Sequence, residues 1–165
     1  MKKLLLLPLL ALVGCAGYTL GPTKPAHLSS VTKIAVPTFE NETLEPRLAV
    51  LVTNAVIKQL QVDGTYQIVN RDQADAVLEA KISDIDKSQW RAVRNNTLRT
   101  SELLVRLRTD YKLKDSAGTA LHQGRVLGES YLVLDANWQL SEHQAMEEAA
   151  QRIAATLVSE IADGW

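Results

Sequence analysis

The 165-residue sequence contains a single cysteine, Cys15, and only three histidines. One cysteine excludes an intrachain disulfide and any metal site built from several thiolates. The histidines, His27, His122 and His143, fall in separate segments without the spacing of a zinc motif. No serine lies in a nucleophile-elbow pattern, and no glycine-rich loop matches a phosphate-binding motif. The sequence therefore predicts no enzyme, no cofactor and no metal.

The sequence also lacks an excess of one charge. Its 18 basic and 19 acidic residues give a formal net charge of −1, which falls by two, to −3, without Lys2 and Lys3 of the N-terminal leader. This balance argues against a general nucleic-acid-binding protein. Beyond the N-terminal apolar run, no segment reaches the roughly 20 apolar residues that span a bilayer. Membrane attachment of the mature chain then depends on Cys15.

The N-terminus has the layout of a secretory signal peptide, with two lysines before an apolar run from Leu4 to Val13. The residues Leu12-Val13-Gly14-Cys15 resemble the lipobox of bacterial lipoproteins, in which the cysteine is acylated and becomes the first mature residue. The alternative is an ordinary signal peptide with an incidental cysteine. We predict a signal peptide over residues 1–14 and lipidation, palmitate included, of Cys15.

Residues 15–30 are predicted to form the lipidated N-terminus and a short extended tether. The tether is rich in turn-forming residues, namely Gly17, Gly21, Pro22 and Pro25. About 15 residues reach at most roughly 50 Å, so the domain must work close to the membrane. Ala16 follows the cysteine, whereas the enterobacterial sorting pattern holds lipoproteins at the inner membrane with Asp at that position. The resemblance therefore implies the outer membrane.

Residues 31–165 are predicted to form one α+β domain, with two helices packed on one face of a small mixed β-sheet. The predicted order is strand, helix, several strands, helix. A first helix starts near Arg47, carries apolar residues at steps of three and four, and ends at Gly64. A last helix is predicted to start at Ser141, which forms a capping-box pattern with Gln144.

Between the helices, alternation of apolar and polar residues predicts strands. The clearest runs from Leu103 to Leu113, and another from Leu121 to Val133 contains Gly124 and Gly128 as marks of bulges or close backbone approach. The polar stretch 88–100 is predicted to be a hairpin tip or a long loop.

A row of basic residues follows from this pattern. The strand 103–113 places Arg106, Arg108 and Lys112 on one face, and the preceding stretch adds Arg91 and Arg94. Arginine binds phosphate with two parallel hydrogen bonds, so the row is suited to a phosphorylated ligand. An ordinary solvated sheet face has the same alternation, and both interpretations remain open.

Short motifs resemble the LPS-assembly lipoprotein family, LptE. They are the start Cys15-Ala16-Gly17-Tyr18, the strand ending Val36-Pro37-Thr38-Phe39-Glu40-Asn41, and the later pieces Tyr66–Val69 and Ala74–Ala76. The resemblance implies a non-enzymatic lipoprotein that assembles with and plugs the large outer-membrane β-barrel LPS translocon. It also implies lipopolysaccharide binding, for which the five basic residues above are our candidates, and a location facing the periplasm or within the barrel lumen.

The same opening is similar to lipoproteins that activate peptidoglycan synthases and to curli-type secretion lipoproteins. Curli-type channels need longer chains with membrane-inserting strands, and synthase activators commonly carry a long disordered arm. The short tether favours a partner near the membrane. An activator of peptidoglycan synthesis, or another envelope assembly factor, remains the alternative.

Overall fold

The computed structural model describes residues 24–94 and 96–164, and the side chains of all of these except 96–99. The predicted signal peptide and the predicted lipidation site, Cys15, lie outside the described residues. The main elements are β1 (Lys33–Ala35), β2 (Glu40–Asn41), α1 (Leu48–Asp63), β3 (Gln67–Ile68), β4 (Ala76–Val93), β5 (Asn96–Asp115), β6 (Ala120–Val133) and α2 (Trp138–Ala162). The 3₁₀ turns η2 (Ala26–Leu28) and η3 (Arg71–Gln73) complete the order. The predicted α+β class and element order are confirmed.

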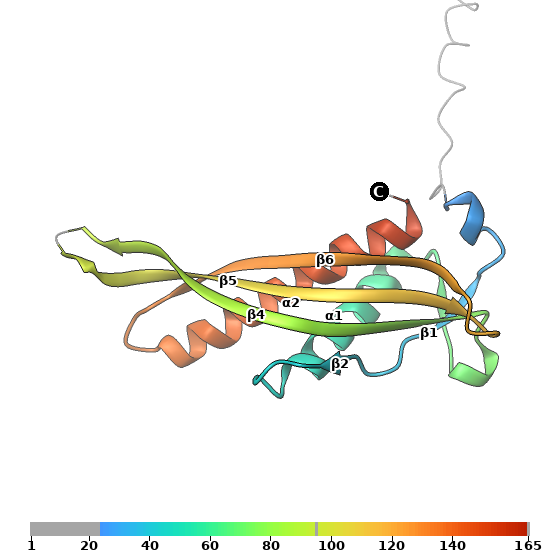
Figure 1. Cartoon of the computed structure of the whole chain (residues 1–165), viewed down its shortest axis with the longest axis horizontal. Helices are drawn as coiled ribbons and strands as arrows, with labels where there is room; N and C mark the ends of the chain where they lie inside the picture. Colours follow the sequence, from blue (N-terminus) through green and yellow to red (C-terminus); the bar gives the residue numbers. More distant parts are fainter. Residues whose placement is uncertain (1–23, 95, 165) are drawn as a thin grey trace, which may run out of the picture.

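The sheet is mixed, in the order β3-β1-β4-β5-β6, with β2 paired beside β4. Strand β1 is parallel to β3 and β4, whereas β4, β5 and β6 form an antiparallel meander. Both helices lie on the same side of the sheet, and the β4–β5 hairpin extends beyond them (Figure 1). One face of the sheet is therefore covered by helices, and the other, which we call the open face, is not.

The apolar stripes of the two helices pack against the covered face. In α1 the buried stripe is Leu48, Val52, Val56 and Leu60. In α2 it includes Ala149, Ile153, Leu157 and Ile161. These positions recur every three or four residues, as the sequence predicted, because 3.6 residues complete one helical turn. Gly64 ends α1 with a positive φ of 75°, a conformation that glycine adopts without strain.

The strand β5 shows the predicted alternation. Its residues Val105, Leu107, Thr109, Tyr111 and Leu113 are at most 2% exposed on the covered face. In the neighbouring strand, a Cβ atom on Gly128 would lie only 2.1 Å from the carbonyl oxygen of Ala149, so glycine is required where α2 crosses β6. The β5–β6 register is unbroken at both glycines. Of the two alternatives predicted for these glycines, close approach of neighbouring atoms is therefore confirmed, and a β-bulge is wrong.

The stretch 88–100 is the tip of the β4–β5 hairpin, the first of the two predicted alternatives, because antiparallel pairing continues β4 to Val93 and starts β5 at Asn96. The predictions for the start of the last helix are wrong. Helix α2 begins at Trp138, so Ser141 lies inside the helix and the predicted capping box does not form. The turn before it is closed by Asp135, whose carboxylate accepts a 2.9 Å hydrogen bond from the Asn137 amide.

The other differences lie near the N-terminus of the domain. Residues 26–28 form the turn η2, and Leu28 is fully buried, so the chain is not an extended tether as far as Ser30. Glu40 and Asn41 form the short strand β2, which pairs with β4. The N-cap residue of α1, Arg47, makes no side-chain capping hydrogen bond. Asn41 instead donates a 2.8 Å hydrogen bond to the Glu45 carbonyl oxygen and so holds the loop before the helix.

Candidate functional site

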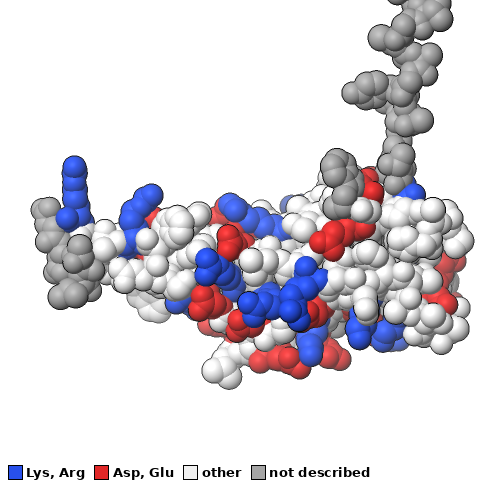
Figure 2. Space-filling model, turned by 45° about the horizontal axis from the view of Figure 1, so that its top comes forward, with Lys and Arg blue, Asp and Glu red and all other residues white. Residues whose placement is uncertain are grey.

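The open face is the surface of the domain that the helices leave free, and it carries rows of charged residues. Alternate residues of β5, from Arg106 to Lys114, point away from the covered face because side chains alternate along a strand. Figure 2 shows positive and negative side chains interspersed over the middle of the visible surface. The face is thus charged without being uniformly basic.

Opposite charges meet across the strands. Arg106 Nε lies 2.7 Å from Glu129 of β6, and its guanidinium lies 3.9 Å from Asp86 of β4. Arg108 lies 3.1 Å from Asp84. The antiparallel register explains these pairs, since it places Asp86 and Glu129 directly beside Arg106. We call this arrangement the charge ladder.

The five basic residues proposed from the sequence are spread along the sheet. Arg91 lies near the hairpin tip, 3.1 Å from Glu102. Arg94 is exposed in the hairpin turn, and Arg106 and Arg108 belong to the charge ladder. Lys112 is exposed and forms no ion pair within the described part of the chain. Arg91, Arg106 and Arg108 are therefore ion-paired, and the part of all five residues in ligand binding stays a prediction.

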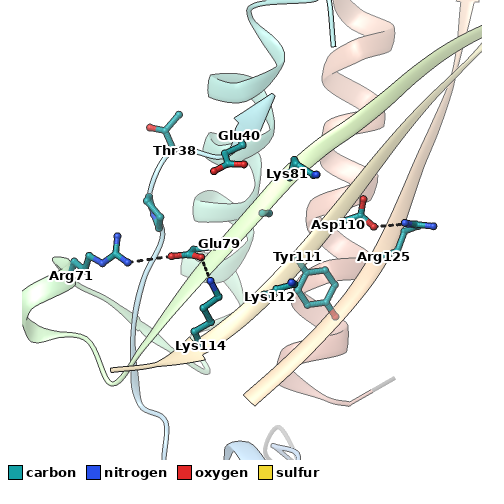
Figure 3. Close-up of a pocket in the computed structure, with 12 residues that line it drawn as sticks. Thr38, Glu40, Arg71, Glu79, Lys81, Asp110, Tyr111, Lys112, Lys114 and Arg125 are labelled. Carbon is teal, nitrogen blue, oxygen red and sulfur yellow. Dashed lines mark hydrogen bonds and ion pairs between the residues drawn. The ribbon is translucent and has the colours of Figure 1, made fainter. Parts of the chain in front are cut away.

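A hollow of about 740 Å³ lies on the open face near the start of β4 (Figure 3). Its charged lining comes from β2, η3, β4, β5 and β6. It comprises five basic residues, Arg71, Lys81, Lys112, Lys114 and Arg125, and three acidic residues, Glu40, Glu79 and Asp110. The excess of two positive charges makes the hollow the part of the open face best suited to an anionic ligand.

Ion pairs fix the walls of the hollow. Glu79 lies 2.6 Å from Lys114 and 3.2 Å from Arg71, and Asp110 lies 2.5 Å from Arg125, as the dashed lines of Figure 3 show. The hydrogen bond from Lys114 lowers the pKa of Glu79, and the one from Arg125 lowers the pKa of Asp110. Both carboxylates stay ionised at neutral pH, so they hold these cations in place.

Lys112 and Lys81 differ from the other cations of the hollow. The Lys81 ammonium lies 3.1 Å from Glu42, outside the lining, and this hydrogen bond raises the pKa of Lys81. Lys112 lines the hollow without an ion pair to any described residue. A ligand phosphate could therefore bind Lys112 without first displacing a carboxylate. The sequence prediction found Lys112 by alternation but missed Arg71, Lys81 and Arg125, whose convergence depends on the register of separate strands.

The other end of the open face is apolar. Trp90 and Tyr131 are about half exposed, with ring centroids 5.3 Å apart. Leu104 lies directly opposite Tyr131 in the β5–β6 ladder and is only 3% exposed. Val133, two residues further along β6, is 49% exposed. We call these four residues the distal patch; the open face thus runs from a cationic hollow to an apolar patch.

The described residues offer no metal site and no membrane-crossing helix. Within residues 24–94 and 96–164, no group of three His, Cys, Asp or Glu residues could hold a metal ion. No helix in these ranges is both long and apolar enough to cross a bilayer.

The three histidines are not all isolated from one another. His27 and His122 stack with ring centroids 5.6 Å apart, whereas His143 lies 3.5 Å from Glu147.

Comparison with known proteins identifies the family. A family model described as "LptE: Lipopolysaccharide-assembly" matches residues 31–163. The chain belongs to this family. The LptE family is one of non-enzymatic assembly lipoproteins of the cell envelope, as the resemblance of the short motifs implied. No curated protein sequence matches the chain.

Solved structures share the fold at low sequence identity. A minor lipoprotein from Acinetobacter baumannii matches with a TM-score of 0.56 and 12% identity, over 81% of this chain and 94% of that one. PelC from Paraburkholderia phytofirmans, solved as a dodecamer, matches with a TM-score of 0.54 and 17% identity, over 86% and 95%. A hypothetical protein from Chlamydia trachomatis matches with a TM-score of 0.56 and 10% identity, over 81% and 96%. At sequence identities this low, the similarity to these structures shows only that the fold is shared.

Proposed function

We propose that the protein is an outer-membrane lipoprotein that assembles with and plugs the β-barrel LPS translocon and binds lipopolysaccharide during its transport. Membership of the LptE family over residues 31–163 is the observation that carries this proposal. In it, acylated Cys15 anchors the chain, and the domain faces the periplasm or occupies the barrel lumen. The protein performs no catalysis in this role.

The shape of the domain supports a place inside a barrel. The strands β4 and β5 contain 18 and 20 residues. At about 3.3 Å per residue, they form a hairpin roughly 60 Å long. A bilayer with its headgroups is about 40–45 Å thick, so a domain standing along the barrel axis extends through the full membrane. The hairpin tip then lies on the side of the membrane opposite the predicted anchor.

The open face supports binding of a phosphorylated amphiphile. Lipopolysaccharide combines phosphate groups with acyl chains, and the open face combines the cationic hollow with the distal patch. Lys112 and Leu104 mark the two regions on the same face of β5, eight residues apart, or roughly 26 Å at the rise of a strand. In this arrangement Lys112 and its neighbours bind phosphate, and Trp90 and Tyr131 contact hydrocarbon.

Co-purification tests the assembly role. The full-length protein, carrying an affinity tag after Trp165, is isolated from detergent-solubilised outer membranes. We expect a large β-barrel to co-purify in a fixed ratio. Recovery of a peptidoglycan synthase in place of a barrel would favour the alternative, an activator of peptidoglycan synthesis, and recovery of neither would contradict both.

Ligand binding is tested with charge reversals and purified lipopolysaccharide. We expect Lys112→Glu to weaken binding about tenfold or more, because it replaces an unpaired cation of the hollow with an anion. Arg106→Glu together with Arg108→Glu should weaken it less, since both arginines already have carboxylate partners. The matched control is Lys58→Glu on α1, a lysine that is exposed and unpaired within the described residues. Equal binding by all variants would contradict the site.

A further inference from the structure

The segment Lys24–Val31, which we call the strap, joins the predicted anchor to β1 and is docked on the domain. The Lys24 ammonium donates a 2.7 Å hydrogen bond to the Val31 carbonyl oxygen and lies 4.5 Å from the centre of the Tyr66 ring. Leu28 and Val31 are buried in the core. Figure 1 shows the strap (blue) at the end of the sheet opposite the hairpin tip. Any anchor on Cys15 therefore acts on the domain through this segment.

A pair of histidines connects the strap to the sheet. The exposed ring of His27 stacks on His122 of β6, with centroids 5.6 Å apart and planes inclined by 28°. His122 Nε2 lies 3.0 Å from the hydroxyl oxygen of Tyr111, and that hydroxyl donates a short hydrogen bond to the Glu160 carboxylate of α2. Because the Tyr111 hydroxyl proton is already donated to Glu160, the Tyr111 oxygen accepts a hydrogen bond from His122 Nε2–H. The other ring nitrogen of His122 remains able to take up a proton.

Protonation of both rings would place two positive charges in stacked contact. We infer that His27 and His122 form an acid-sensitive clasp, which holds the strap on the domain at neutral pH and loosens it in acid. The titratable groups that face His122 come from three elements: His27 of the strap, the neutral Tyr111 of β5 and Glu160 of α2. Glu160 favours the charged ring but is already bonded to Tyr111, whereas the like charge of His27 opposes it.

The direction of the pH effect follows from the same contacts. Burial and the neighbouring His27 lower the pKa of His122 in the docked state. The docked state then binds fewer protons than the released state, in which His122 has the ordinary histidine pKa of about 6.5. Docking is favoured above that pH and weakens as the pH falls below it. Release of residues 24–30 would lengthen the tether by roughly 23 Å, which changes how far the domain can move from its anchor.

Hydrogen–deuterium exchange of the full-length protein in detergent micelles tests the clasp. The Leu28 and Val31 amides report docking, since they donate to carbonyl oxygens of the strap at 2.9 and 3.0 Å. After correction for intrinsic exchange, we expect at least fivefold less protection of the strap at pH 5.0 than at pH 7.5. Peptides of α1 should not change, which separates local release from global unfolding. Equal protection of the strap at both pH values would overturn the clasp.

Two substitutions assign the effect to the histidine pair. The substitution His122→Gln keeps an N–H donor for Tyr111 but cannot become charged, and His27→Gln alters an exposed ring only. We expect His27→Gln and His122→Gln to keep the strap protected at both pH values. His143→Gln is the control, because His143 lies on α2 beside Glu147 and should leave the acid response intact. An acid response that persists in both variants, or a strap unprotected at both pH values, would overturn the inference.

Discussion

The two faces of the sheet are built from the same strands but are held by different forces. On the covered face, residues such as Leu107 are fully buried, and burial of a leucine contributes about 1.5–3 kcal/mol. On the open face, Arg108 is 46% exposed and its ion pair with Asp84 contributes at most about 1 kcal/mol. Stability of the fold therefore comes from the covered face.

This difference leaves the open face free to exchange partners. Each carboxylate of the charge ladder holds its arginine weakly, so a ligand phosphate can take its place at small cost to the fold. The covered face has no such freedom, because its contacts depend on close packing of particular side chains. The comparison predicts that substitutions on the covered face change stability, whereas those on the open face change binding.

The neighbours Leu107 and Arg108 test this contrast most directly. Leu107→Ala should lower the free energy of unfolding by about 2–5 kcal/mol, because it removes buried methyl groups and leaves a cavity. Arg108→Ala should lower it by less than about 1 kcal/mol. Urea unfolding followed by circular dichroism measures both values. Similar losses in the two variants would contradict the assignment of stability to the covered face.

The glycine beneath α2 should give the next largest effect. Gly128→Ala places a methyl group 2.1 Å from the Ala149 carbonyl oxygen, so the backbone of α2 must move. We expect a loss of about 1–3 kcal/mol, measured by the same unfolding experiment. Gln123→Ala, at an exposed position of the same strand, is the control and should have almost no effect. A neutral Gly128→Ala would show that the helix does not rest closely on β6.

The covered face could be predicted from the sequence because its signal is local. Val105, Leu107 and Tyr111 alternate with polar residues within one strand, and that spacing alone assigns them to one face. The helical stripes are local in the same way. The family could also be recognised, because its motifs are short contiguous pieces in the first half of the chain.

The open face could not be predicted in the same way, because its pairs join different strands. Glu129 lies beside Arg106 only through the β5–β6 register, which a single strand does not reveal. The sequence leaves open whether the polar stretch 88–100 is a hairpin tip or a long loop for a similar reason, since its strands are stabilised by pairing with each other. The stacking of His27 on His122 joins segments 95 residues apart in the numbering and carries no local signal.

Removal of two buried hydroxyl groups of the covered face should change the stability of the protein in opposite directions. Thr109 is fully buried, and its hydroxyl oxygen has no hydrogen-bond partner within the described residues. Thr109→Val should therefore stabilise the protein by about 1 kcal/mol, since it removes an unsatisfied polar group. Ser130 donates a 2.5 Å hydrogen bond to the Ala145 carbonyl oxygen, so Ser130→Ala should destabilise the protein by about as much. Melting temperatures measured side by side would contradict this if both variants shifted in the same direction.

The smallest effect is expected at Glu79 in the wall of the hollow. Its hydrogen bond from Lys114 lowers its pKa below the ordinary value, so the folded state binds fewer protons than the unfolded state. The stability that Glu79 provides is present above pH about 4.3 and is lost as the pH falls through its lowered pKa. Glu79→Gln should therefore cost less than about 1 kcal/mol at pH 7, discounted because the side chain is 36% exposed, and nothing at pH 2. The free energy of unfolding of both proteins, measured across this pH range with and without 1 M salt, checks the sign of the effect. A loss of stability in Glu79→Gln that grew in acid or persisted in high salt would mean that Glu79 acts through packing rather than charge.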